Sequence, residues 1–377
     1  MHKDLDITNI LYSMQEGTFW TDAWAQSWAE VQRAELAGLV PAIKRIVIVG
    51  CGTSNYAGFY GKEMMEAYTG IPTSVVDGNT GRYLDAKLYT PDTLFIGISN
   101  TGNSGTAVES IDRAAKGGAR TLSITGNPDS RIAAVSDAIL FFPGAVDKVA
   151  TKTRSYIETM IMLLALAVRM GQILGCADVP TADTVEDEMV RCGQAAGKVF
   201  HLYDGMMAEL AADYKAKEGF HIVGAGLNLG NAMEAGLKLC EIGWVNSEGM
   251  ELESFMHGKF RGAGPQTPFF VMAHDDQTFK TAVNFVAVAK QVGAECITIT
   301  DRDFVPLKGL SHRTMLIDSV WEVLCPMLFI LPVYMFAVYL GIERGHENPA
   351  VSQFGRPAQT IQFETLYPDY EAYASDV

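Results

Sequence analysis

The chain has 377 residues, 48% hydrophobic and 19% charged, so it can bury one large α/β body or the cores of two domains. Its 29 basic and 44 acidic side chains give a net charge of −15. Binding to nucleic acid or to an anionic membrane needs clustered lysine and arginine, so we expect neither partner.

The amino-terminal segment predicts a helix. Trp20, Trp24 and Trp28 recur at every fourth position, which is typical of an amphipathic helix packed on a larger body. The first residues carry no apolar core of a signal peptide, and the cysteines show no Cys-x-x-Cys spacing. We therefore expect a cytoplasmic protein with reduced core thiols. The cysteines are Cys51, Cys176, Cys192, Cys240, Cys296 and Cys325.

A glycine-rich turn from Gly50 to Ala57 follows the first predicted strand and suggests a dinucleotide site as one hypothesis. The third glycine of the dinucleotide fingerprint would fall at Asn55. The acidic residue expected to contact the ribose has only Asp77 as a candidate. The incomplete pattern makes this hypothesis the weaker one, and the sequence contains no Gly-Lys-Ser/Thr motif of a nucleoside triphosphatase.

The most informative stretch runs from Leu94 to Val108. An apolar strand, Leu94 to Ile98, is predicted to stop at Ser99, and a helix is predicted to begin near Ser104 or Thr106. Glycines and hydroxyls fill the turn between them. A turn of this composition can point its backbone N–H groups inward at the N-terminus of the following helix, where they can bind a phosphate. The alternative is an ordinary strand-to-helix turn with hydroxyl caps.

The two halves of the chain come into register after a shift of about 175 positions, so that Leu94 meets Phe269 and Thr106 meets Thr281. Each half then reads as strands alternating with helices, which predicts a parallel sheet covered on both faces. The fold class is α/β, with two tandem domains of flavodoxin-like or Rossmann-like αβα type. Where the first half has the Ser99 turn, the second has His274-Asp275-Asp276, whose carboxylates would repel an anion.

Candidate chemistry in the second half lies between Lys238 and Gly258. Lys238 and Glu241 are three apart on a predicted helix, Gly230 to Trp244, and an ordinary ion pair would explain them equally well. His257 is expected in the first turn of another helix, where a structural role is the alternative to a catalytic one. These residues alone indicate no more than carboxylate and imidazole acid–base chemistry.

Together these segments resemble the double sugar isomerase (SIS) domain family. The chain is most similar to the deglycases of phosphorylated Amadori products and to the isomerase half of glucosamine-fructose-6-phosphate aminotransferase. The matching signatures occur in family order: Gly50 to Ser54, Ser99 to Ser104, Val149 to Lys152, Glu234 to Glu241, and His257-Gly258.

The resemblance implies a role for each site residue. Glu241 matches the catalytic glutamate that moves protons at C1 and C2 of the sugar. His257 matches a histidine used in ring opening or acid catalysis, which the other subunit of a dimer typically donates. The implied substrate and phosphate ligands are Gly52, Thr53, Ser54, Ser99, Asn100, Thr101, Ser104, Thr151 and Lys238.

Two departures from the family favour deglycation of a 6-phosphorylated Amadori compound. No glutaminase domain precedes the first strand, and no lysine follows Lys308, where isomerase relatives carry a tail lysine that forms an imine. A substrate already bearing an amine on C1 needs neither. Lys259 stands where the family commonly has proline after His-Gly. The alternatives are an amino-sugar-phosphate isomerase or deaminase, and a non-catalytic sugar-phosphate sensor.

We expect an amino-terminal helical segment (1–40), SIS domain 1 with the phosphate site (41–180), linker helices (181–215), SIS domain 2 (216–345) and a tail (346–377). Val323 to Ile342 is long enough for a membrane span, but two prolines favour a buried or subunit-interface helix. A homodimer or higher homo-oligomer with a shared site is expected. Its partner is a small sugar phosphate, and no metal or other cofactor is implied, because no histidines are spaced as a ligand set.

Overall fold

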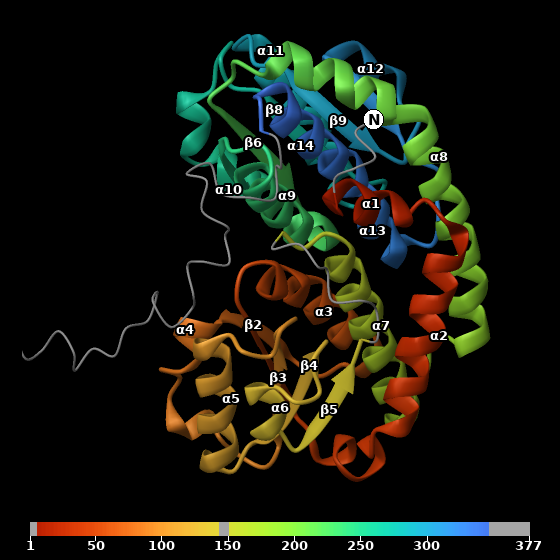
Figure 1. The fold of residues 1–377 in the computed structure, drawn as a ribbon, viewed down its shortest axis with the longest axis vertical. Helices are drawn as coiled ribbons and strands as arrows, with labels where there is room; N and C mark the ends of the chain where they lie inside the picture. The colour runs from red at the N-terminus through yellow and green to blue at the C-terminus, as the bar shows by residue number, and fades with distance from the viewer. Residues whose placement is uncertain (1–5, 143–150, 347–377) are drawn as a thin grey trace, which may run out of the picture.

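A computed structural model describes residues 6–142 and 151–346, and within them the chain forms two five-stranded parallel sheets. Figure 1 shows the sheet of the first half below and that of the second half above, with helices between and around them. The predicted α/β class and its two parallel sheets are confirmed.

The first sheet has the order β2-β1-β3-β4-β5, and all its pairings are parallel. Apolar side chains alternate along β1, so that Ile46 and Ile48 enter one core while Val47 and Val49 enter another. Both faces are therefore buried, as a parallel sheet requires. The strands are β1 (Arg45–Gly50), β2 (Thr73–Asp77), β3 (Thr93–Ile98), β4 (Arg120–Thr125) and β5 (Ala138–Phe141).

The second sheet repeats this topology, with β6, β7, β8, β9 and β10 in the places of β1 to β5. The repeat seen in the sequence is thus a structural duplication, and β8 begins at Phe269, the predicted partner of Leu94 near the start of β3. The strands are β6 (Gly219–Gly224), β7 (Asn246–Glu251), β8 (Phe269–Ala273), β9 (Cys296–Thr300) and β10 (Arg313–Leu316).

One hydrophobic core joins the two halves. It is formed by the face of the first sheet that carries Ile48, by the face of the second sheet that carries Ile222, and by the helices between them. Each outer face has a smaller core of its own under short helices. The helices of the first half are α3 (Thr53–Thr69), α4 (Gly78–Gly81), α5 (Gly105–Gly117), α6 (Arg131–Ala134) and α7 (Arg154–Leu174). Those of the second half are α9 (Leu229–Glu241), α10 (Leu252–Met256), α11 (Phe279–Gln291), α12 (Val305–Leu310), α13 (Cys325–Phe329) and α14 (Leu331–Glu343).

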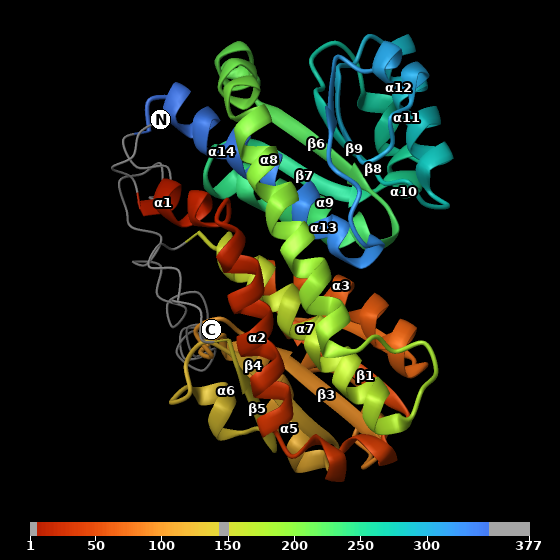
Figure 2. The same cartoon turned by 90° about the vertical axis from the view of Figure 1, so that its right-hand side faces the viewer.

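Three further helices brace the halves from one side: α1 (Asp6–Ser13), α2 (Gly17–Arg33) and α8 (Ala182–Tyr214). In Figure 2, α8 runs along the side of both sheets with α2 next to it. Trp20 and Trp24 are buried and Trp28 stacks on Trp24, so the predicted amphipathic helix is confirmed. Short 3-10 turns complete the described chain: η1 (Leu36–Gly38), η2 (Val40–Ala42), η3 (Ala86–Leu88), η4 (Gly226–Asn228), η5 (Lys259–Gly262) and η6 (Glu322–Leu324).

Two helical segments are long and apolar enough to cross a membrane, Arg154–Leu174 and Glu322–Glu343. The protein itself buries 78% of the 18-residue apolar stretch of the first and 89% of that of the second, as expected of core helices in a two-sheet body. The interpretation of residues 323–342 as a buried segment is therefore confirmed. Because α14 is enclosed by its own chain, it does not supply the apolar subunit interface that the sequence had suggested.

The cysteines are free, as predicted, but only Cys192, Cys296 and Cys325 are buried. Cys51 and Cys176 are partly exposed, and Cys240 is exposed on α9. The expectation of six core thiols was therefore wrong for half of them. Cys240 contacts the backbone of Ser247 at the start of β7 and stays accessible to solvent.

Helix α9 is held in place by unusually close backbone packing. A Cβ atom on Gly249 of β7 would lie 1.7 Å from the carbonyl oxygen of Ala232, and one on Gly230 would lie 2.4 Å from that of Tyr56 on α3. Only glycine permits these approaches. The helix is thereby wedged between the second sheet and the first half of the chain.

We predict that Gly249→Ala lowers the free energy of unfolding by about 1–3 kcal/mol, because the new methyl group overpacks the contact between α9 and β7. Gly262→Ala is the matched control, since no atom lies within 4 Å of its added Cβ, and it should stay within about 0.5 kcal/mol of the parent. Urea unfolding followed by circular dichroism measures both. Equal stability of the two variants would contradict the close packing.

Candidate functional site

A polar cradle lies at the carboxyl edge of the first sheet, formed by the turns that follow β1 and β3. These strands are neighbours, with Val49 paired to Gly97, so the Gly52 turn and the Ser99 turn lie side by side. Cys51 Sγ reaches Thr106 Oγ1 at 3.3 Å across them. Ligands of open parallel sheets bind at this edge.

Two helices present uncapped N-termini to this cradle. Helix α5 begins after Ser104, as predicted, and the Ser104 side chain makes no capping hydrogen bond. Helix α3 begins after Gly52, which has no side chain and a φ of 53°. The first N–H groups of a helix have no partner within it and carry partial positive charge. Both ends therefore favour an anion at this edge.

The Ser99 turn also holds unsatisfied polar atoms. Asn100 Nδ2 and Oδ1 are buried, and neither has a hydrogen-bond partner in the described part of the chain. Ser130 Oγ is also buried without a hydrogen-bond partner among the described residues, and a Cβ on Gly102 would lie 2.0 Å from it. Buried polar atoms without partners are costly, and a polar ligand would satisfy them. Ser99 is buried at the base of the turn, while Thr101 is exposed.

Lys238 on α9 connects this cradle to the second half of the chain. Its side chain is fully buried, and its Nζ donates to Thr53 Oγ1 at 2.9 Å and to Glu241 Oε2 at 2.6 Å. Its Nζ also lies 3.2 Å from Glu234 Oε1, which accepts a hydrogen bond from the Tyr334 hydroxyl. The Lys238 ammonium group therefore links Glu241 directly to Thr53, the first residue of α3.

The three charges differ in exposure and in protonation. Burial raises the pKa of Glu234 to about 7, although Lys238 acts in the opposite direction. Burial disfavours the charged form of Lys238, but Glu234 and Glu241 outweigh it and raise the pKa of the ammonium. Glu241 keeps 38% of its side chain exposed. The cluster therefore offers one accessible carboxylate beside a permanent buried cation.

Thr151 lies at the amino-terminal end of α7, beside the same edge. Helices α3 and α7 run in the same direction, because Gly61 meets Leu163 and Tyr68 meets Gly171. Their N-termini therefore lie together, which brings buried Thr151 toward the turn that bears Thr53 and Ser54. Val149 and Ala150 of the matching signature lie outside the described residues.

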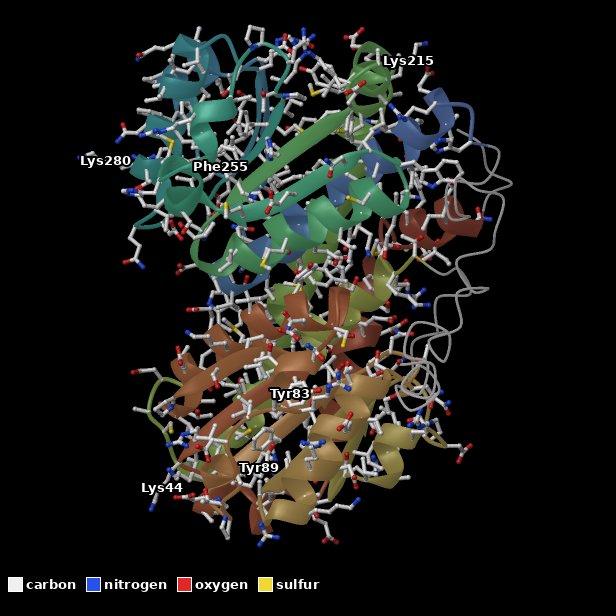
Figure 3. All side chains as sticks on the ribbon, turned by 90° about the vertical axis from the view of Figure 1, so that its left-hand side faces the viewer. Lys44, Tyr83, Tyr89, Lys215, Phe255 and Lys280 are labelled. Atoms are coloured by element: carbon white, nitrogen blue, oxygen red, sulfur yellow. The ribbon has the colours of Figure 1, made fainter. Side chains whose placement is uncertain are left out.

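His257 is not brought to this cluster within one chain. Its side chain is 77% exposed, and its Nε2 lies 3.2 Å from Glu253. It follows the last residue of α10, so the prediction that it begins a helix was wrong. The cause is Glu251, whose carboxylate accepts from the N–H groups of Glu253 and Ser254 and starts the helix earlier. Phe255, labelled in Figure 3, is buried and anchors α10 to the second sheet.

Two other sequence expectations need correction. Helix α9 ends at Glu241 rather than at Trp244, which has a φ of 52° and cannot continue a right-handed helix. Lys238 was expected among the phosphate ligands, yet its ammonium group is enclosed by two carboxylates and Thr53. Its observable role is to hold Glu241.

Two members of the site, Glu234 and Ser130, have no role predicted from the sequence. Glu234 is spaced four residues before Lys238 and seven before Glu241, so helical periodicity would have placed all three on one face. Ser130 had no such signal, because it follows β4 and reaches the Ser99 turn only through the fold.

Comparison with known proteins places the duplication in a family. The model described as SIS domain matches residues 41–169 and again residues 214–344. The chain belongs to the SIS domain family. The matches cover both sheets, the cradle and the Lys238 cluster.

Among curated proteins, the chain is similar to glutamine–fructose-6-phosphate aminotransferase [isomerizing] of Thermococcus kodakarensis, at 25% identity over 80% of the chain. It is 26% identical to the same enzyme of Clostridium tetani over an equal share. The chain spans about half the length of these relatives, since the matches cover 50% of each.

Among solved structures, the fold resembles the C-terminal domain of glucosamine-fructose-6-phosphate aminotransferase from Francisella tularensis. The TM-score is 0.82 at 19% identity, and the match covers 91% of this chain and 98% of that one. A putative phosphosugar isomerase from Clostridium difficile matches with a TM-score of 0.75 at 18% identity, over 96% and 97% of the two chains. At these identities the likeness concerns the fold.

The elevated pKa of Glu234 makes a stability prediction with a definite sign. A carboxyl group with a folded-state pKa near 7 and an ordinary value of 4.5 binds more protons in the native state between these pH values. Its contribution to stability therefore falls as pH rises from 5 to 8. We predict that the stability of the parent relative to Glu234→Gln drops by on the order of 2 kcal/mol over this range.

Urea unfolding at pH 5 and pH 8 tests this difference, and all other titrating groups are common to both proteins. Glu63→Gln, on the surface of α3, is the matched control and should show no such pH-dependent difference. A constant offset between parent and Glu234→Gln would show that Glu234 titrates normally.

Proposed function

We propose that the chain is a deglycase that hydrolyses a 6-phosphorylated Amadori compound to a hexose 6-phosphate and a free amine. The observation that supports this most directly is the placement of Glu241. An accessible carboxylate is fixed by Lys238 beside an uncapped, hydroxyl-lined anion cradle in the same chain.

In this proposal the phosphate binds at the Ser99 turn and the N-termini of α3 and α5. The ligands are backbone N–H groups with the side chains of Thr53, Ser54, Ser99, Asn100, Thr101 and Ser104, with Thr151 next to them. Helix N-terminal N–H groups and hydroxyls suit a phosphate without any basic side chain. Anchoring the far end of an open sugar phosphate leaves C1 and C2 to extend toward Glu241.

Glu241 then acts as the general base. It removes a proton from C1 of the ketoamine, giving an enaminol, and the proton returned to C2 leaves an imine between C1 and the substrate's own nitrogen. Water adds to C1 of this imine, and the C1–N bond breaks with transfer of a proton to the leaving amine. The sum is one water consumed, one hexose 6-phosphate and one amine released.

The state of Lys238 supports a route without an enzyme-bound imine. A lysine nucleophile must be neutral to attack a carbonyl carbon. Lys238 is enclosed by two carboxylates that raise its pKa, so it stays an ammonium ion. It is a positioning residue that orients Glu241.

An amino-sugar-phosphate isomerase or deaminase is the second candidate function. The relatives named aminotransferase, and a Thermotoga maritima structure named glucosamine-6-phosphate deaminase with a TM-score of 0.68, favour it. It would use the same cradle and carboxylate on a different substrate. A cytoplasmic setting and a sugar-phosphate ligand are common to both candidates and to a non-catalytic sensor.

The deciding experiment is a substrate panel. Purified protein is incubated with 6-phosphorylated adducts of fructose or glucose with lysine, aspartate and asparagine, and separately with glucosamine 6-phosphate and with fructose 6-phosphate plus ammonia. Mass spectrometry follows hexose 6-phosphate and amine. Release from an amino-acid adduct supports the deglycase, turnover of the amino sugar alone supports the second candidate, and binding without turnover identifies a sensor.

We predict that Glu241→Gln lowers kcat on the best substrate by about 10²–10⁴-fold, because proton transfer at C1 loses its base. The dissociation constant should change little, since the cradle is untouched. Isothermal titration calorimetry and steady-state kinetics measure the two quantities. Glu63→Gln is the control with parental kinetics, and a Glu241→Gln variant with parental kcat would remove Glu241 from the mechanism.

We predict complementation between subunits if His257 serves a neighbouring site. Glu241→Gln and His257→Ala proteins, each inactive, are mixed to form hybrid dimers. One site of each hybrid would regain both groups, so activity should recover to about a quarter of the parental value when subunits exchange at random. Mass spectrometry confirms hybrid formation. Hybrids without activity would show that His257 acts within its own chain.

A further inference from the structure

The second half of the chain carries a buried cluster at the position that corresponds to the phosphate cradle of the first. Strand β8 ends at Ala273 as β3 ends at Ile98, and His274 follows it where Ser99 follows β3. The side chains of His274 and Asp301 are only 5% and 3% exposed. Cys325, at the start of α13, is buried beside them.

The atoms of this cluster are arranged as metal ligands. His274 Nδ1 lies 2.8 Å from Asp301 Oδ2, and Cys325 Sγ lies 3.5 Å from the same oxygen. One ligand atom from each residue falls within 4.8 Å of the other two. Ligands of a tetrahedral ion with bond lengths of about 2.0–2.3 Å stand about 3.3–3.8 Å apart. The Cys325–Asp301 separation already fits, and His274 Nδ1 would move about 0.5 Å away from Asp301 as an ion enters between them.

His274 is the second, independent observation. Both of its ring nitrogens are buried, and neither makes an aligned hydrogen bond within residues 6–142 and 151–346. The Nδ1 atom is near Asp301, but the approach lacks the direction of an N–H···O bond. A buried imidazole whose Nε2 has no partner among the described residues and whose Nδ1 makes only a misaligned pair with Asp301 is costly in a purely structural role. An ion between Nδ1 and the carboxylate would satisfy Nδ1.

We propose that His274, Asp301 and Cys325 bind a divalent transition metal of the Zn²⁺ type. One imidazole nitrogen, one carboxylate oxygen and one thiolate are the donors that Zn²⁺ takes in proteins, and a thiolate disfavours Mg²⁺ and Ca²⁺. On binding, the Cys325 thiol releases its proton to solvent and the imidazole coordinates as the neutral base. The doubly charged cation then balances one thiolate and one carboxylate, so the buried site is neutral.

The fourth ligand is a water on the acidic side of the cluster. Asp276 and Glu322 each place a carboxylate oxygen within 4.8 Å of a His274 nitrogen and of one another. A water that they hold completes the tetrahedron, so the site stays neutral. The carboxylates that replaced the hydroxyls of the first copy thus turn an anion site into a cation site.

The location indicates a structural ion. It would join the ends of β8 and β9 to the first residue of α13. The next residue, Pro326, accepts a hydrogen bond of 2.5 Å from Asn231 on α9, the helix that carries Lys238 and Glu241. The ion would thereby make the contact between α13 and α9 more rigid without touching a substrate.

The test uses untagged protein purified without chelator, and it is independent of the proposed function. Inductively coupled plasma mass spectrometry should find about one zinc per chain, and Co²⁺ exchanged for it should show visible bands with a thiolate charge-transfer band. Dialysis against a chelator should lower Tm, and added Zn²⁺ should restore it.

Cys325→Ser and His274→Gln should reduce bound zinc to below about 0.1 per chain and abolish the charge-transfer band. Cys296→Ser is the matched control, because it removes another buried thiol of the same half at the opposite end of β9. Its zinc content should equal that of the parent.

Parent protein that holds no zinc and gives no Co²⁺ charge-transfer band would overturn the proposal and leave His274 and Asp301 as a buried ion pair. Zinc retained by Cys325→Ser would overturn it as well. The measurements on the parent decide the matter even when a variant fails to fold.

Discussion

The buried ammonium of Lys238 is the interaction on which the arrangement of the site depends. It binds Glu234 and Glu241 on its own helix and Thr53 on the first half of the chain. Burying such charges costs several kcal/mol in desolvation, which their mutual attraction only partly returns. An ion cluster of this kind is weak as a source of stability, and its value lies in the single geometry that it imposes on Glu241.

Close packing makes that geometry rigid. Helix α9 approaches β7 on one side and α3 on the other at distances that only glycine allows, and both sheets share one core around it. The two halves therefore cannot shift relative to one another without opening the core. The proposed base, carried by one half, and the proposed anion cradle, formed by the other, are held in a fixed relation, as catalysis by proximity requires.

The two copies of the domain have diverged at the same structural position. In the first copy the carboxyl edge keeps hydroxyls, glycine and uncapped helices, whereas the second copy has an imidazole and carboxylates after β8. The parallel sheet places whatever follows these strands at its carboxyl edge, so each copy presents a site there. Which ion or ligand each site suits depends on a few side chains, since the backbone scaffold is common to both.

The sequence by itself determined the duplication, the parallel sheets and the strand-to-helix turn at Ser99, because these follow from local periodicity and glycine placement. The pairing of Lys238 with Glu241 was also within reach, since helical spacing fixes it. Only the tertiary structure decided that Lys238 reaches Thr53, that Asn100 is left unsatisfied, and that His274, Asp301 and Cys325 converge. Those contacts join segments far apart in the chain, and their geometry depends on how helices and sheets pack rather than on any local pattern.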